Sequence, residues 1–96
     1  MKYNFDLPIT QLDGKPFDDN LTLGKAVFMC ASTQLRGDES LDLNAKLRLY
    51  GLSKLGYEGG MVALTAEDIT TIKERAARAF SNYVVVGRIA EILEGK

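Results

Sequence analysis

Three pairs of adjacent carboxylates are the residues best suited to chemistry in this sequence: Asp18-Asp19, Asp38-Glu39 and Glu67-Asp68. Two neighbouring carboxyl groups can act as general acid and general base when their environments separate their pKa values. Each pair, however, precedes or opens a predicted helix, where the positive end of the helix dipole favours acidic side chains without any catalytic role. We therefore interpret the pairs as structural.

Other catalytic arrangements are missing from the sequence. Cys30 is the single cysteine and the chain contains no histidine, so a base that could activate the thiol is not evident. Ligands at zinc-finger or triad spacing do not occur, and Gly24-Lys25 lies outside any phosphate-loop spacing. The sequence predicts a buried structural cysteine and a protein that is not an enzyme, with no cofactor and no metal.

A second feature is a cluster of basic residues near the C-terminus. The candidate basic patch consists of Lys73, Arg75, Arg78 and Arg88. Glu74 interrupts the cluster, and the whole chain has 12 basic against 13 acidic residues and a formal net charge of −1. Binding through phosphate neutralisation normally needs a basic face, and base stacking needs exposed aromatic residues. We favour a solvated surface and keep nucleic-acid contact as the weaker alternative.

The strongest candidate for a functional site is an apolar stripe on the second predicted helix. At helical spacing Leu43, Leu47 and Tyr50 gather on one side of this helix, opposite a second apolar face. That second face consists of Leu41, Ala45, Leu49, Leu52 and Leu55. A helix with two apolar faces is either enclosed in the core or lends one face to a partner. Both readings stay open, and we name the first stripe as the candidate protein interface.

The elements that carry these residues predict a single α+β domain over residues 1–96. Tyr3, Phe5 and Leu7 alternate with polar residues as in a half-buried strand, and Asp13-Gly14 is typical of a tight turn. We expect an N-terminal β-hairpin here. The segment 61–64 is a candidate third strand that could pair with it. Three to four helices pack on these strands.

The helices are expected at about 20–33, 40–56, 66–80 and 82–94. Asn20 or Thr22 would cap the first helix, and Ser40 would cap the second, which would end at Gly56. Thr65 with Asp68 fits a capping box at the start of the third.

The last helix includes residues that weaken an isolated helix, namely Val84, Val85, Val86 and Gly87. Packing must stabilise it, and Gly87 could admit a neighbouring backbone. Asn82 or Ser81 would cap it. A short strand at 83–86, followed by a helix, is the alternative.

The composition of the chain indicates where the protein is located and which partners are not expected. No apolar run approaches the length of about 20 residues that a membrane-spanning helix needs, and the first residues lack the apolar core of a signal peptide. The lone cysteine excludes an intramolecular disulfide framework. We expect a cytoplasmic protein with no membrane partner.

Short motifs along most of the chain resemble small accessory proteins encoded by tailed phages and prophages. The resemblance rests on "LDGKP", "LTLGKA" and "VALTAEDITTIKERAARAF…VVVGRIAEILEG". Such proteins often carry proline before the last valines, whereas this chain has Asn82-Tyr83. The resemblance implies no catalytic residues. It implies a phage origin, with action in the host cytoplasm.

Together these features predict a phage accessory protein that acts by protein–protein binding, for example by inhibiting a host factor. A virion or tail assembly component is the alternative, and a nucleic-acid-binding regulator is less favoured. If the stripe of Leu43, Leu47 and Tyr50 is exposed, we further expect a homodimer at micromolar concentration, because polar residues flank the stripe on both sides.

Overall fold

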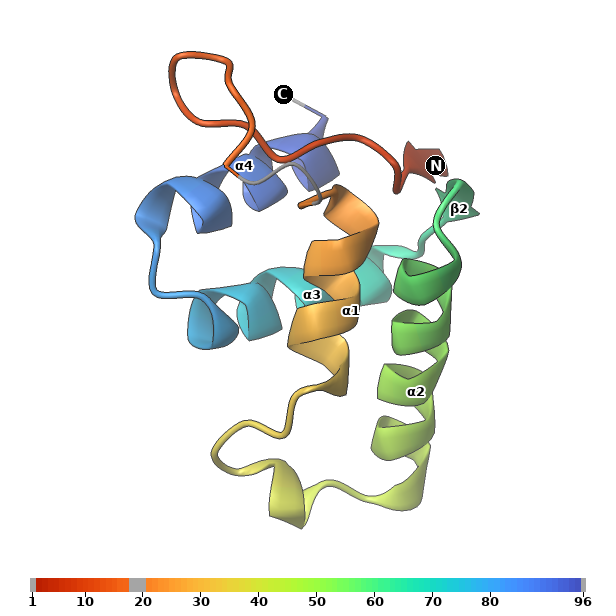
Figure 1. Ribbon diagram of the computed structural model, residues 1–96. Coiled ribbons are helices and arrows are strands. Elements are labelled where there is room, and N and C mark those ends of the chain that lie inside the picture. The colour runs from red at the N-terminus through yellow and green to blue at the C-terminus, as the bar shows by residue number, and fades with distance from the viewer. Residues whose placement is uncertain (1, 18–20, 96) are drawn as a thin grey trace.

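The fold is built from seven short elements, and the computed structural model describes residues 2–17 and 21–95 (Figure 1). In chain order the elements are β1 (Lys2–Asn4), α1 (Leu23–Ser32), the 3₁₀ helix η1 (Asp38–Ser40), α2 (Leu43–Glu58), β2 (Met61–Ala63), α3 (Ala66–Ala79) and α4 (Tyr83–Glu94). The α+β class predicted from the sequence is confirmed, and the described residues contain four α-helices and one antiparallel strand pair.

The strand pair joins the N-terminus to the segment after α2. β1 and β2 are antiparallel, with Tyr3 opposite Val62, and both of these side chains are buried. The predicted pairing of residues 61–64 with the N-terminal segment is therefore confirmed. The Tyr3 hydroxyl also donates a hydrogen bond of 2.8 Å to the carbonyl oxygen of Leu93, which ties β1 to the end of α4.

Residues 9–17 form a tight loop rather than a second ladder. Gly14 adopts a positive φ of 86°, as expected for the turn after Asp13, and its amide donates to the Gln11 carbonyl oxygen at 3.0 Å. Outside the named strands, the described residues here form isolated bridges, Pro8 with Thr22 and Thr10 with Pro16. Proline has no amide hydrogen to donate, so a longer ladder cannot continue through these positions.

Each of the four α-helices in the described residues starts at a side-chain cap, and three of these caps are ones that the sequence predicted. Thr22 caps α1, Thr65 and Asp68 form the predicted capping box of α3, and Asn82 caps α4 by accepting from the amides of Val84 and Val85. The fourth segment is therefore a helix from Tyr83, and the alternative strand at 83–86 is wrong. The other residues considered for the start of the first helix, Asp18, Asp19 and Asn20, lie outside the described residues.

The helix α2 begins and ends later than the sequence predicted. Ser40 belongs to η1, where its hydroxyl donates to the Gly37 carbonyl oxygen, and Asp42 caps α2 instead by accepting from Ala45 at 2.8 Å. At the other end the stop is Gly59, with φ of 74°, rather than Gly56. The short 3₁₀ turn uses the serine that would otherwise have served as the cap.

Close packing of α2 on α1 depends on two glycines. A Cβ atom added at Gly56 would lie 2.6 Å from the Gly24 carbonyl oxygen, and one added at Gly24 would lie 2.9 Å from the Gly56 carbonyl oxygen. The two helix backbones therefore touch at this crossing. The close approach predicted at Gly87 is wrong, because no heavy atom lies within 4 Å of a Cβ placed there.

The core is one cluster to which every strand and α-helix contributes. Its largest fully buried side chains are Phe5, Ile9, Leu23, Ile72, Ile89, Leu93, Val27 and Cys30. Of α2, only Leu52 and Gly56 are buried. This helix is therefore attached to the core along one narrow face. In the described part of the chain, no helix is both long and apolar enough to cross a membrane.

Candidate protein interface

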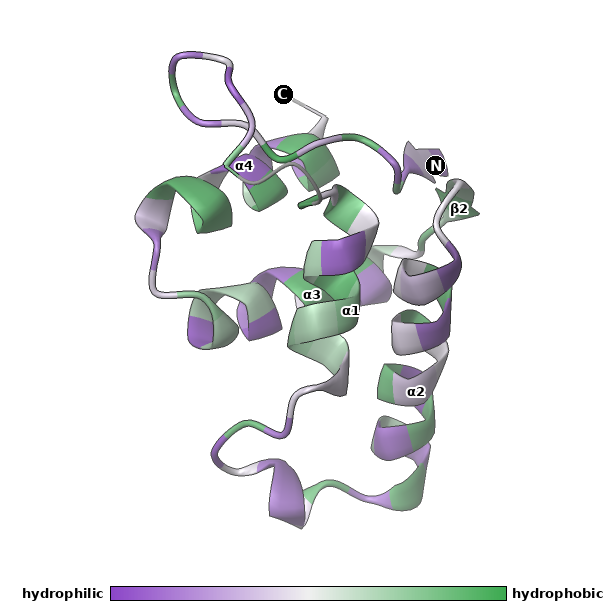
Figure 2. Cartoon of the chain, viewed as in Figure 1, coloured by the Kyte–Doolittle hydropathy of each residue, from purple (hydrophilic) through white to green (hydrophobic). Residues whose placement is uncertain are grey.

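The α2 stripe, defined as Leu43, Leu47 and Tyr50, lies on the outer surface of the molecule. The exposed fractions of these residues are 70%, 54% and 62%. The opposite face carries the buried Leu52, with Ala45 and Leu49 half-buried. The alternative in which the stripe is enclosed in the core is therefore wrong for the single chain. Figure 2 shows hydrophobic and hydrophilic residues alternating along the whole of α2, as two opposed apolar faces require.

The position of α2 explains this exposure. The helix packs mainly against α1 and stands to one side of α3 and α4 (Figure 1). The second apolar face named from the sequence would anchor α2 firmly on the other helices if all of its residues were buried. Instead Leu41, Ala45 and Leu49 are only half-buried. A surface ion pair of 2.6 Å between Arg48 and Glu67 links α2 to α3. The first half of α2 thus has few core contacts.

The exposed surface continues beyond the three predicted residues. Tyr57 is 80% exposed and follows Tyr50 at heptad spacing, while the Lys54 ammonium lies over the Tyr50 ring, 5.6 Å from its centroid. The Tyr57 ring also packs at 5.8 Å, in a tilted geometry, on Phe28 of α1. Our sequence analysis missed Tyr57, although its spacing from Leu43 and Tyr50 was a usable signal.

A groove lies beside the stripe, between α1, the segment before α2, and α2. It has a volume of about 690 Å³. Its apolar wall is formed by Phe28, Ala31, Leu41, Leu49, Tyr50 and Tyr57. Tyr50 belongs both to the stripe and to this wall, so the outer face of α2 and the groove form a continuous surface. Mostly apolar walls with a few polar groups are typical of binding sites in proteins.

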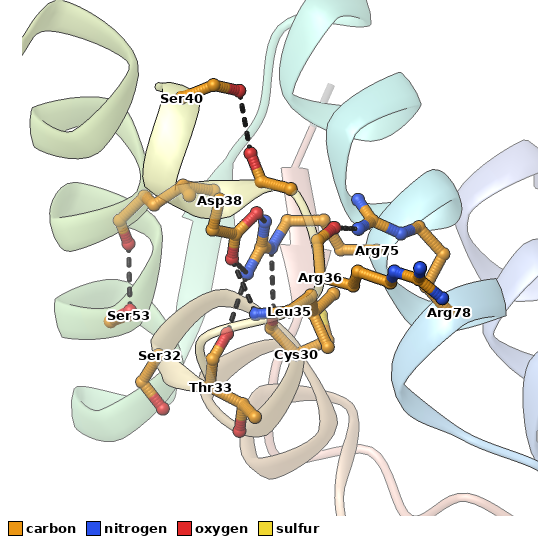
Figure 3. A network of polar contacts seen from close by, with 12 residues as sticks. Cys30, Ser32, Thr33, Leu35, Arg36, Asp38, Ser40, Ser53, Arg75 and Arg78 are labelled. Carbon is orange, nitrogen blue, oxygen red and sulfur yellow. Dashed lines mark hydrogen bonds and ion pairs between the residues drawn. The ribbon is translucent and has the colours of Figure 1, made fainter. Parts of the chain in front are cut away.

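The groove ends at a buried ion pair that fixes its shape. Arg75 is 6% exposed, and its guanidinium donates to both carboxylate oxygens of Asp38, at 3.0 and 2.9 Å (Figure 3). It also donates to the carbonyl oxygens of Cys30 and Thr33, each at 2.8 Å. These bonds hold η1 and the end of α1 against α3. The expectation that Arg75 lies on an exposed charged face is therefore wrong.

The ion pair with Arg75 changes the pKa of Asp38. The hydrogen bond from Arg75 is the main cause that lowers the pKa of Asp38 from its ordinary 3.8 to about 2. A further hydrogen bond of 2.7 Å from the Leu35 amide also favours the charged carboxylate. Asp38, one of the carboxylates considered for catalysis, is thus held ionised by a structural partner.

The other three residues of the predicted basic patch bind different parts of the chain. Lys73 pairs with Glu94 at 3.0 Å. Arg78 donates to the Arg36 carbonyl oxygen, and Arg88 donates to the carbonyl oxygens of Thr10 and Gln11, at 3.1 and 3.0 Å. The first bond joins α3 to α4, and the bonds of Arg78 and Arg88 attach loops to these two helices.

The other residues weighed for chemistry also have structural roles. Cys30 is 1% exposed, and burial raises the pKa of its thiol to about 11, which disfavours the reactive thiolate. Asp68 caps α3 and Glu67 pairs with Arg48. Within residues 2–17 and 21–95, no group of three or more acidic or cysteine side chains is placed to hold a metal ion.

Comparison with protein-family models, with curated proteins and with solved structures gives no match for this chain.

Proposed function

We propose that this chain is a non-enzymatic protein-binding module that acts through the α2 stripe. The observation that carries the proposal is the exposure of Leu43, Leu47 and Tyr50 on a helix that uses its opposite face for the core. Contiguous exposed apolar surface usually marks an interaction site, because leaving it in water is unfavourable. The adjoining groove offers further apolar walls for a partner.

The chemistry of the remaining residues supports a binding role over catalysis. The carboxylates of Asp38 and Asp68 are engaged in an ion pair and a helix cap, and the Cys30 thiol is buried. The four basic side chains of the predicted patch are bonded to carboxylates and carbonyl oxygens of the chain itself. A protein partner is thus better supported than a nucleic acid.

Salt dependence tests this choice of partner class. The tagged chain would be incubated with lysate of the producing cells, and retained protein and nucleic acid would be compared at low salt and at about 1 M salt, where charge–charge attraction is screened. We expect retained protein at both salt concentrations, lost on Leu47→Glu. The matched control is Leu12→Glu, because Leu12 is 80% exposed in a distant loop. Retained nucleic acid that is lost at high salt and on Arg78→Glu would contradict the proposal.

The phage accessory role is a further proposal that rests on the sequence resemblance. We propose action on a host factor, with particle assembly as the alternative. Mass spectrometry of purified phage particles separates the two: presence of the chain in stoichiometric amount would assign it to assembly. Absence from particles, together with Leu47-dependent retention of a host protein, would assign it to host inhibition.

A further inference from the structure

The spacing of residues along the outer face of α2 matches the seam of a helix pair. Leu43, Leu47, Tyr50, Lys54 and Tyr57 follow one another at alternating intervals of four and three residues, the spacing of the d and a positions of a heptad repeat. We call this set the extended α2 stripe. Its apolar members are all more than half exposed in the single chain. Such a seam is buried by another helix that carries a compatible seam.

A second copy of the chain carries the same seam on its own α2. In an antiparallel pair the a position of one helix faces the d position of the other. Leu47 would then face Tyr50 of the second copy, and Leu43 would face Lys54. Both pairings occur at one and the same register, so a two-fold axis beside Arg48 and Leu49 pairs four of the five stripe residues, while Tyr57 lies beyond the start of the second copy's α2. A two-fold arrangement of one surface on itself is the commonest form of homodimer.

Charge selects the antiparallel direction. In the antiparallel register Lys54 reaches the start of the second copy's α2, where Asp42 caps the helix with its carboxylate. In a parallel pair Lys54 would face Lys54 across the seam. Like charges placed opposite each other are unfavourable. The residues before Asp42 turn away from the helix axis toward α1 (Figure 1), which leaves this end of α2 accessible.

The flanks of the seam are compatible with this pairing. Lys46 would lie beside Ser53 of the second copy, and Asn44 beside Gly51. Neither contact places like charges together. Gly51 has no heavy atom within 4 Å of a Cβ position, so this side of α2 is open to an approaching helix.

From the seam, the register and the charge pattern, we infer that two copies of the chain associate through an antiparallel, two-fold pairing of the extended α2 stripe. This inference rests on the proposed function, since it names a second copy as a partner of the same surface. Because the seam is short and contains a lysine, the dimer is weak and forms in the micromolar range.

Sedimentation velocity over a concentration series tests the association. The wild-type chain is expected to shift from monomer to dimer across the micromolar range. Leu47→Glu should stay monomeric throughout, and Lys54→Glu should raise the dissociation constant at least tenfold, because it places a carboxylate beside Asp42. The matched controls are Leu12→Glu and Lys15→Glu, the same substitutions at exposed loop positions. Circular dichroism establishes that each variant folds.

Disulfide trapping tests the direction. In a Cys30→Ala background, chains with Leu43→Cys and chains with Lys54→Cys are oxidised separately and as a mixture. The antiparallel pair predicts a cross-linked dimer in the mixture and none in either chain alone. Self-linking of either chain alone would overturn the antiparallel register.

The remaining outcomes separate this inference from the proposed function. A wild-type chain that stays monomeric, yet binds another protein in a Leu47-dependent way, would overturn the second copy as occupant and leave the binding function intact. A monomer without any Leu47-dependent partner would overturn both.

Discussion

At the scale of single residues, the most consequential side chain is Arg75. Removing an arginine from water is costly, and the cost is offset only when its hydrogen-bonding groups are satisfied. Here the carboxylate of Asp38 and the carbonyl oxygens of Cys30 and Thr33 accept its hydrogen bonds. These acceptors lie at the end of α1 and in η1. One side chain of α3 therefore fixes the segment that leads into α2.

Asp38→Asn should destabilise the protein, because it leaves the buried guanidinium without its counter-charge. We expect the free energy of unfolding to fall by about 2–3 kcal/mol, since the carbonyl bonds to Arg75 can persist. Urea denaturation at neutral pH measures the change. Glu39→Gln, which removes a charge from the exposed neighbour, is the control and should change little. Equal stability of the two variants would contradict the role given to the pair.

The same carboxylate predicts a pH dependence. Its pKa is lowered by folding, so its contribution to stability is fully present above the ordinary value of 3.8 and is lost as pH falls toward about 2. The difference in unfolding free energy between wild type and Asp38→Asn should therefore be constant above about pH 5 and shrink below pH 4. Urea titrations between neutral pH and about pH 2 measure this difference. A difference that grows on acidification would contradict the assignment.

At the scale of elements, the position of α2 depends on its contact with α1. The backbones meet at Gly24 and Gly56, where the space for a Cβ atom is occupied by backbone atoms. Rigid backbone cannot yield as the end of a flexible side chain can. This crossing therefore sets where the outer face of α2 lies.

Gly56→Ala should separate the two helices. Its Cβ would lie 2.6 Å from the Gly24 carbonyl oxygen and 2.7 Å from the Phe28 amide nitrogen, so we expect a loss of about 2–3 kcal/mol in unfolding free energy. Gly51→Ala, in the same helix with open space around the Cβ position, should instead stabilise by about 0.5–1 kcal/mol. Thermal denaturation of dilute samples compares the two. Similar effects for both substitutions would argue against the close crossing.

The helix α4 depends on its cap more than the other helices do, because its valines and Gly87 have poor helix propensity. Asn82→Ala removes the acceptor for the amides of Val84 and Val85, and we expect a loss of about 1 kcal/mol. The control is Ser81→Ala, at an exposed position next to the cap. Urea denaturation of both variants measures the effect, and an equal loss for Ser81→Ala would contradict the cap assignment.

Local signals in the sequence predicted much of this arrangement. The capping box at Thr65, the helix after Asn82 and the pairing of residues 61–64 all follow from residue types that act within a few positions or alternate in a strand. The start of α2 was misplaced because Ser40 and Asp42 are both good caps, and the 3₁₀ turn decides between them. The burial of Arg75 and the contact between Gly24 and Gly56 could not be predicted in this way. Both depend on residues that are far apart in the sequence, whereas hydrophobic periodicity describes only neighbouring positions.

At the scale of the whole molecule, the two apolar faces of α2 lie in different environments. Leu52 and Gly56 attach the helix to α1 and the core, while Leu43, Leu47 and Tyr50 remain in water. The Asp38–Arg75 pair holds the preceding segment in place without covering the outer face. The chain thus presents a helix on a stable support, which is what a docking surface requires.

If the α2 stripe is a binding surface, the core of the single chain does not depend on it. The most direct measurement is the unfolding free energy of Leu47→Glu in dilute solution, compared with that of Leu52→Glu. We expect Leu47→Glu to change stability by no more than about 0.5 kcal/mol, because this side chain is 54% exposed. Leu52→Glu, at a position 3% exposed, should prevent folding. A Leu47→Glu protein that is as unstable as Leu52→Glu would place the stripe in the core and contradict its role as a binding surface.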